Sequence, residues 1–329
     1  MIDPTDTQPW KELSEHSSKL EASNLKELLL GDPSRLEDLS FRFNDRSNPL
    51  GDFYIDFSKQ KITKETLNLL VALAYELELP RKINDLFNGE TVNISENRPA
   101  LHTALRSRGT PEVDVDDIIR SELTKAQLFA SNVRDGKWRG STGKEISTVV
   151  NIGIGGSHLG PLMTSTALKD YVAWDGALRF ISNIDPSDVV SKLEDLDPES
   201  TLFIINSKSF TTKETIKNAE TAIKWLQEHL GSEEEFLNKH LVAVTANAEK
   251  VAQLGIQENN IFSIWDWVGG RFSIFSSVGL ALMIALGDLH YASLHDGARS
   301  IDKHFRSVDL SENIPVLMGL IGIWNRNFL

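Results

Sequence analysis

The stretch NIGIGGSHLGP (residues 151–161) decides the fold, because it places four glycines directly behind an apolar run. Glycine weakens the interior of a strand or a helix, so this density predicts a turn in which side chains would obstruct a close approach. The preceding run, STVVNIGI (residues 147–154), has the composition of a buried strand. We therefore expect a strand that ends in a tight turn, here called the glycine turn (residues 153–157), followed by a helix.

Outward from this turn, short β-rich runs alternate with longer amphipathic stretches. The runs are residues 147–154, 177–184, 201–206, 241–247 and, more weakly, 260–265. Helix-like segments, among them 212–230 and 248–254, lie between them. Alternation of this kind is typical of a parallel sheet covered by helices on both faces. The sequence therefore predicts an α/β domain with a doubly wound, five-stranded parallel sheet at residues 145–287.

The flanking regions are predicted to be helical. Residues 1–144 contain few strand signals, and TLNLLVALAYELEL (residues 66–79) is an apolar helix that we expect to end at Pro80. The last residues, PVLMGLIGIWNRNFL (315–329), form an apolar helix with no capping glycine and no polar tail. We expect residues 288–329 to be the truncated, helical start of a second domain, with an apolar end that awaits a missing partner or a dimer face.

Composition excludes several classes of function. The chain of 329 residues has 34 Lys and Arg against 47 Asp and Glu, a formal charge of -13 that repels nucleic acid and anionic membranes. It has no cysteine, which removes disulfides, thiolate metal sites and cysteine nucleophiles. The eight histidines form no metal-ligand motif, and the longest apolar run, residues 278–286, is shorter than the ~20 residues of a membrane span. We expect a cytoplasmic protein without metal, membrane or nucleic-acid partners.

The glycine turn is a candidate anion site. Ligands of open parallel sheets bind beyond the carboxyl ends of strands, where backbone N–H groups of a helix start attract an anion and Ser157 adds a hydroxyl. His158 occupies the place of the third glycine in G-x-G-x-x-G, and no G-K-[ST] follows, so neither a dinucleotide fingerprint nor a P-loop is present. A tight turn that only packs a strand against a helix is the alternative.

A second loop, SKSFTTKET (residues 207–215, the hydroxyl loop), follows the run 201–206. Five of its residues carry hydroxyls, and Lys208 and Lys213 lie among them. Thr211 and Glu214 have the spacing of a capping box, which predicts a helix start. Hydroxyls and backbone donors beside a lysine suit a phosphate monoester. The alternative is that the hydroxyls only cap the helix.

The third stretch is DWVGGRFSIFSSVGL (residues 266–280), whose first part, residues 266–275, we call the arginine loop. Gly269 and Gly270 permit an unusual backbone path, and Arg271 is expected between this turn and a helix over 273–286. A guanidinium in that place would stabilise oxygens that become negative during a reaction. Pairing of Arg271 with Asp266 or with a helix carboxylate is the structural alternative.

Together with ENRPALHTALR (residues 96–106), these stretches resemble the glucose-6-phosphate isomerase family, in the family's order and along the whole chain. The resemblance implies sugar-isomerase (SIS) domains with helical extensions and a homodimer with shared active sites. It also implies interconversion of glucose 6-phosphate and fructose 6-phosphate through an enediolate, in glycolysis and gluconeogenesis, with no cofactor.

The resemblance also implies roles for individual residues. Gly156, Ser157 and Gly270 would contact the substrate, and Arg271 would lie near the C1 and C2 oxygens. The sugar phosphate would be held by residues of the hydroxyl loop, namely Ser207, Lys208, Ser209, Thr211 and Thr212. Ser209 stands where the family commonly has Thr, and His158 where it frequently has Asp.

The family's catalytic glutamate, ring-opening histidine and late lysine lie in motifs beyond the point that matches Leu329. We therefore expect the 329 residues alone to be nearly inactive as an isomerase. The alternative function is a non-catalytic sugar-phosphate-binding module. A regulator of that kind normally carries a DNA-binding helix, and no basic recognition helix is evident in this sequence.

Overall fold

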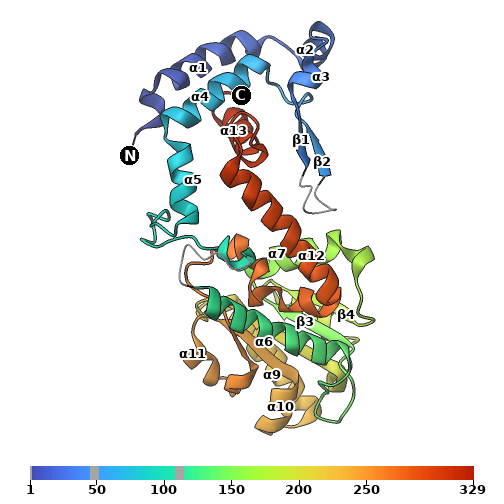
Figure 1. The fold of residues 1–329 in the computed structure, drawn as a ribbon. Coiled ribbons are helices and arrows are strands. Elements are labelled where there is room, and N and C mark those ends of the chain that lie inside the picture. Colours follow the sequence, from blue (N-terminus) through green and yellow to red (C-terminus); the bar gives the residue numbers. More distant parts are fainter. Residues whose placement is uncertain (1, 45–51, 108–114) are drawn as a thin grey trace. The chain divides into compact units, whose positions relative to one another are not determined.

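The computed structural model describes residues 2–44, 52–107 and 115–329 (Figure 1). The chain forms two compact units, one of Met1–Asn97 with Asp296–Leu329 and one of Arg98–His295. The sequence predicted domain boundaries after residues 144 and 287, which differ from the bounds of these units. The domain boundaries themselves stay a prediction. The second cut falls inside helix α12 (Leu280–Ser307), which is kinked at Gly287 by a φ of 70°.

The second unit is built on one five-stranded parallel sheet, which confirms the predicted fold class. The strand order is β4-β3-β5-β6-β7. The strands are β3 (Thr148–Ile152), β4 (Ala177–Ile181), β5 (Thr201–Asn206), β6 (Leu241–Thr245) and β7 (Ile261–Ser263). Every residue of β3, β5 and β6 is buried, as expected for strands that are covered on both faces.

Helices cover both faces of this sheet. Alternate strand residues, such as Val150, Phe203 and Ala243, pack in one cluster with apolar residues of the helices on one face. Those helices are α8 (Pro186–Leu193), α9 (Lys213–Leu230), α10 (Glu234–His240) and α11 (Ala248–Ala252). The other face carries α6 (Asp116–Arg134) and α7 (Gly156–Ala167), with Phe129 of α6 against Phe262 of β7.

The first unit is mainly helical but contains an antiparallel hairpin that the sequence analysis did not predict, β1 (Ser40–Asn44) with β2 (Asp52–Asp56). The predicted helix 66–79 is α4 (Lys64–Glu76), and Pro80 lies in the first turn of a further helix, α5 (Leu79–Phe87). The remaining helices of the unit's first segment are α1 (Gln8–Glu21), α2 (Leu25–Gly31) and α3 (Arg35–Asp38).

The apolar end of the chain is largely buried, contrary to the expectation that it awaits a partner. Helix α13 (Ile314–Asn327) packs into the core of the first unit beside α1 and α4 (Figure 1). Leu317 and Trp324 are fully buried, and the Trp324 indole donates to the carbonyl of Lys61 at 2.9 Å. The apolar faces of α1 and α4 pack against α13, so the two ends of the chain share one core.

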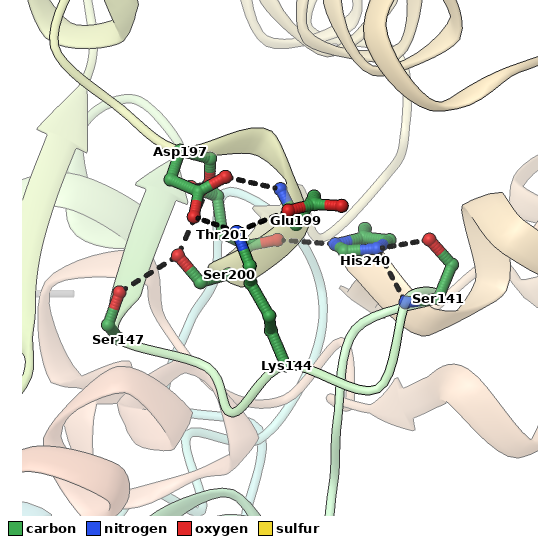
Figure 2. A network of polar contacts seen from close by, with 8 residues as sticks. All are labelled: Ser141, Lys144, Ser147, Asp197, Glu199, Ser200, Thr201 and His240. Carbon is green, nitrogen blue, oxygen red and sulfur yellow. Dashed lines mark hydrogen bonds and ion pairs between the residues drawn. The ribbon is translucent and has the colours of Figure 1, made fainter.

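The amino edge of the sheet in the second unit holds a polar network (Figure 2). The buried imidazole of His240 donates from Nδ1 to the carbonyl of Thr201 at 2.8 Å. Its Nε2 therefore accepts from the amide and the hydroxyl of Ser141, at 2.9 and 3.0 Å. Lys144 forms ion pairs with Asp197 and Glu199. This network ties the loop before β3 to the starts of β5 and β6.

One helix of the described residues, 277–307, is long and apolar enough to cross a membrane by length and composition. The apolar run 278–286 lies inside this helix, which continues with polar and charged residues such as Asp288. Its most apolar window is 67% buried inside the structure, as is usual for a core helix. The helix is therefore weak support for a membrane span.

Candidate functional site

The glycine turn and the hydroxyl loop leave the sheet at a topological switch point. Strands β3 and β5 are neighbours, but the chain first leaves β3 for β4 on the other side before it returns to form β5. Helix α7 follows β3 and helix α9 follows β5, and they lie on opposite faces of the sheet. Ligands of open α/β sheets bind in the crevice that opens at such a point.

Two asparagines at the strand ends hold these loops together. The buried side chain of Asn206, the last residue of β5, donates to Oδ1 of Asn151 in β3 at 2.5 Å. Asn151 in turn donates to the carbonyl of Ser157 at 3.0 Å. A methyl group on Gly153 would come within 3.1 Å of the Asn206 carbonyl, so the turn passes close to the end of β5. This pair was not predicted from the sequence. Its signal there was one asparagine in each of the two predicted strand runs, 147–154 and 201–206.

The glycines of the turn also bring it against the arginine loop. Gly155 has a φ of 60° and precedes the first residue of α7 without a side-chain cap. A Cβ on Gly156 would lie 2.0 Å from the carbonyl oxygen of Gly270, and one on Gly160 would lie 2.1 Å from the side chain of Ile274. These contacts require glycine, because two backbones meet where any side chain would separate them.

The hydroxyl loop contains two unusual features. Phe210 is buried and has a φ of 50°, which turns the backbone sharply between Ser209 and Thr211, whose hydroxyls lie 2.6 Å apart. Ser207 is buried, and its Oγ has no hydrogen-bond partner. A buried polar atom without a partner is costly, so it marks a position that a ligand or water would satisfy.

The predicted capping box does not form. Helix α9 begins at Lys213, its N-cap is Thr212 rather than Thr211, and no side chain caps it. The reason is local, since the left-handed Phe210 and the contact between Ser209 and Thr211 draw the Thr211 hydroxyl away from the helix. The N-terminus of α9 therefore keeps backbone donors that no side chain of the loop caps, which is the arrangement that attracts anions.

Lys208 joins the hydroxyl loop to the arginine loop. Its ammonium group donates to the carbonyls of Asp266 at 3.4 Å and Val268 at 3.3 Å. Together with the contact between Gly156 and Gly270, this bond connects all three loops. The loops of Ser157, Ser207 and Arg271 are thus contiguous at one edge of one sheet.

Arg271 lies in a short 3₁₀ helix, Gly270–Phe275, and not directly before a long helix as predicted. Helix α12 begins only at Leu280, after a second 3₁₀ turn, because the hydroxyls of Ser273 and Ser276 bond back to the carbonyls of Gly270 and Ser273. Arg271 is exposed, and its guanidinium lies 4.9 Å from the centre of the Phe272 ring.

The structural alternative for Arg271 is not realised, because Asp266 pairs with a different arginine. Arg98 approaches the Asp266 carboxylate at 3.5 Å and donates to its carbonyl at 3.2 Å. No ion pair of Arg271 is found within the described part of the chain. Its charge is therefore available for a ligand.

The motif 96–106 contributes further groups for which sequence reasoning gave no roles. Arg106 lies over the Phe275 ring at 4.7 Å, and the His102 ring stacks on Phe272 with 4.3 Å between centres. Burial and the charges of Arg106 and Arg271 lower the pKa of His102 to about 4. Among residues 2–44, 52–107 and 115–329, no cluster of three or more His, Asp or Glu residues is arranged to hold a metal ion.

Comparison with known proteins identifies the family to which these loops belong. Residues 56–329 match the phosphoglucose isomerase family. The chain belongs to that family. Curated relatives include glucose-6-phosphate isomerase 3 of Rhodococcus jostii, 45% identical over 98% of this chain and 58% of the relative. The glucose-6-phosphate isomerase of Methylococcus capsulatus is 44% identical over 100% of this chain and 60% of the relative.

A solved structure agrees with this assignment. The crystal structure of a glucose-6-phosphate isomerase from Chlamydia trachomatis superposes with a TM-score of 0.82 and 28% identity, covering 100% of this chain and 61% of that one. The chain therefore spans about three fifths of the length of the relatives it matches.

Proposed function

We propose that this chain provides the sugar-phosphate grip and the oxyanion-stabilising arginine of an isomerase that interconverts glucose 6-phosphate and fructose 6-phosphate. The observation that carries the proposal is the contact of three loops at the switch point of the sheet, through Gly156 against Gly270 and Lys208 against the arginine loop. The names of the family and of its curated relatives, phosphoglucose isomerase and glucose-6-phosphate isomerase, support glucose 6-phosphate as one of the two substrates.

The phosphate would be bound by the hydroxyl loop. The unpartnered hydroxyl of Ser207, the hydroxyls of Ser209 and Thr211 and the uncapped start of α9 are donors that a phosphate monoester needs. Lys208 would add a positive charge beside the phosphate, and its hydrogen bonds to the arginine loop would hold the two loops together. Gly156 and Ser157 would let the sugar chain pass close to the start of α7.

Arg271 would act on the sugar end of the ligand. Transfer of a proton between C2 and C1 passes through an enediolate, whose oxygens carry more negative charge than those of the substrate. An exposed guanidinium with no carboxylate partner in the described residues binds that charge more strongly as it develops, which lowers the barrier. Loss of Arg271 is thus expected to reduce turnover more than affinity.

The base for this proton transfer is not assigned within the three loops. Their carboxylates are those of Glu214 and Asp266, and Asp266 is paired with Arg98. We therefore propose that the 329-residue chain binds sugar phosphates but turns them over slowly. A coupled assay with fructose 6-phosphate tests this, and turnover at the rate of a full-length relative would refute it.

The binding proposal is tested by calorimetry with glucose 6-phosphate. The double substitution Ser207→Ala and Lys208→Ala removes two donors, each worth about 1.5 to 3 kcal/mol when the acceptor is charged, so affinity should fall by two orders of magnitude or more. Thr221→Ala is the control, because Thr221 lies on α9, the helix that follows the hydroxyl loop, and its hydroxyl donates to the carbonyl of Lys217. Equal affinity of the double variant and the control would refute the assignment.

Assembly and location are proposed from the family resemblance and from composition. A homodimer is expected because the resemblance implies active sites that share residues of two subunits. Sedimentation of the purified chain tests it, and a monomer at micromolar concentration would contradict it. A cytoplasmic location is proposed from the absence of cysteine, which fits a reducing compartment.

A further inference from the structure

The segment 98–106 runs alongside the arginine loop in matching order. Leu101 donates its amide to the carbonyl of Trp267 at 3.1 Å. His102 stacks on Phe272, and four residues later Arg106 lies over Phe275, which is three residues after Phe272. Arg98, at the start of the segment, contacts Asp266, at the start of the loop. The contacts continue along the length of the arginine loop, so the segment is a support for it rather than a chance neighbour.

His102 is connected to Arg271 through a shared neighbour, the ring of Phe272. The His102 and Phe272 rings are nearly parallel, with an angle of 15° and 4.3 Å between centres. The same Phe272 ring carries the Arg271 guanidinium at 4.9 Å. A flat ring held by stacking on one neighbour gives a second planar group a fixed surface on which to rest.

We propose that His102 is a positioning residue for Arg271: its neutral imidazole fixes the Phe272 ring, and this ring holds the guanidinium toward the ligand. The inference rests on the proposed function, since it specifies how the oxyanion-stabilising arginine of that site is oriented. His102 is not a catalytic acid or base in this proposal, because its Nδ1 is buried without a partner and it acts only through Phe272.

Charge makes histidine suitable here. Two arginines, Arg106 and Arg271, face the ring, so a protonated imidazole would be repelled and the stack would weaken. Burial and these two charges lower the pKa of His102 to about 4, which keeps the ring neutral at physiological pH. A neutral aromatic ring can pack between cations at a place where a lysine or a protonated histidine would be expelled.

The coupling between His102 and Arg271 is tested first without any ligand. Titration of the His102 ring by NMR should give a pKa near 4 in the parent chain and a higher value in Arg271→Ala, because one of the charges that lowers it is gone. His240, whose pKa is lowered by burial while Thr201, Asp197 and Glu199 at the amino edge oppose the shift, is the control ring, and its pKa should be the same in both proteins. An unchanged His102 pKa in Arg271→Ala would overturn the proposal.

The positioning role is tested next with two ligands of the same phosphate and chain length. A phosphorylated aldonate has a carboxylate where the enediolate has its charge, whereas the phosphorylated alditol has only a hydroxyl there. Arg271 should make the parent chain prefer the aldonate. His102→Ala should reduce this preference about tenfold, the effect of one weakened charge-assisted hydrogen bond, and leave alditol affinity unchanged.

Two further variants separate positioning from general damage. His102→Phe keeps a ring that can stack on Phe272 and should restore most of the preference, and His229→Ala should not alter it. An equal loss of affinity for both ligands in His102→Ala, or no rescue by His102→Phe, would overturn the positioning role.

The outcomes also separate this proposal from the proposed function. If the parent chain binds neither ligand while the NMR coupling is present, the proposed function fails and the positioning of a catalytic arginine fails with it. If the parent binds and discriminates but His102→Ala does so equally, only the further inference fails.

Discussion

The two edges of the same parallel sheet differ in the hydrogen bonding of their buried polar groups. At the amino edge, His240 uses both ring nitrogens, and Ser141, Ser147, Ser200 and Thr201 are joined by hydrogen bonds (Figure 2). At the carboxyl edge, the buried Oγ of Ser207 and Oδ1 of Asn206 have no partner. One edge satisfies its buried polar atoms internally, and the other leaves donors and acceptors unused.

This difference separates a structural network from the proposed binding site. A polar group that is buried and fully bonded adds rigidity, whereas one that is buried and unbonded lowers stability unless something else satisfies it. The cations follow the same division. Lys144 at the amino edge is paired with two carboxylates, whereas Arg271 at the carboxyl edge has no carboxylate within the described residues. In a chain with a charge of -13, an arginine at this edge with no carboxylate partner among the described residues supports the proposal of an anionic ligand.

The largest expected effect comes from separating the loops of the carboxyl edge. Gly156→Ala would place a methyl group 2.0 Å from the Gly270 carbonyl, so one backbone must move. We expect sugar-phosphate affinity to fall at least a hundredfold and the unfolding free energy to fall by about 1 to 3 kcal/mol, the usual cost of overpacking. Calorimetry and denaturant unfolding measure both.

The control for this substitution is Gly319→Ala in α13, where a Cβ meets no atom within 4 Å. It should raise stability slightly, because alanine favours a helix by about 1 kcal/mol over glycine. Unaltered ligand affinity in Gly156→Ala would mean that contact of the glycine turn with the arginine loop is not needed for binding.

At the amino edge, His240→Ala should affect stability alone. The substitution leaves the Ser141 amide and the Thr201 carbonyl without their partner in a buried place, at a cost of about 1 to 3 kcal/mol for each unsatisfied group. We expect the unfolding free energy to fall by about 2 to 4 kcal/mol and sugar-phosphate affinity at 20 °C, well below unfolding, to stay as in the parent. His229→Ala, an exposed histidine of the same unit, should change stability by less than about 0.5 kcal/mol. A fall in affinity with unchanged stability would reverse the roles given to the two edges.

The sequence predicted most of the second unit because its signals there are local. All five strands lie within the predicted runs, and α9 begins at Lys213, one residue after the start of the predicted segment 212–230. Strand runs, glycine clusters and hydroxyl-rich loops act through neighbours in the chain, and the order of strands then follows the rules for parallel sheets. Local signals also singled out the glycine turn, the hydroxyl loop and the arginine loop, and the resemblance implied the roles of their residues, which stay predictions.

The features that sequence reasoning missed depend on contacts between distant segments. The burial of Trp324 against Lys61, the stack of His102 on Phe272 and the network of His240 with Ser141 each join residues about a hundred or more positions apart. No periodicity encodes such pairs. The capping box at Thr211 failed for a different reason, since the left-handed backbone at Phe210 has no signature in a residue that normally avoids it.

A smaller effect is expected in the pH dependence of the unfolding free energy, to which His240 at the amino edge contributes. Burial lowers the pKa of His240 below 6.5, although the Thr201 carbonyl, Asp197 and Glu199 oppose the shift. The folded state therefore favours the neutral ring, so its contribution is complete above the unfolded pKa and is lost as pH falls from about 6.5 toward the folded value. Protonation at Nε2 would also remove the acceptor of both Ser141 bonds.

The measurement is the unfolding free energy of the parent and of His240→Gln between pH 7.5 and 5. Other histidines with lowered pKa values contribute to the parent slope, so the difference between the two proteins isolates His240. The parent should lose up to about 1.4 kcal/mol more per pH unit below pH 6.5. Parallel curves would show that His240 is not held neutral by the fold.

The smallest effect is expected at the ion pairs of the amino edge. The Lys144 side chain is 51% exposed, and its partners Asp197 and Glu199 are 47% and 33% exposed. Water and salt screen such pairs, so Lys144→Ala should leave the unfolding free energy close to that of the parent, and 1 M NaCl should remove any remaining difference. Lys137→Ala, which removes the exposed pair with Asp135 in the same region, is the matched control. If Lys144→Ala destabilised the chain more than His240→Ala, ion pairs rather than the buried imidazole would stabilise the amino edge. The contrast between the two edges would then depend on charge pairing and not on the hydrogen bonds of buried polar groups.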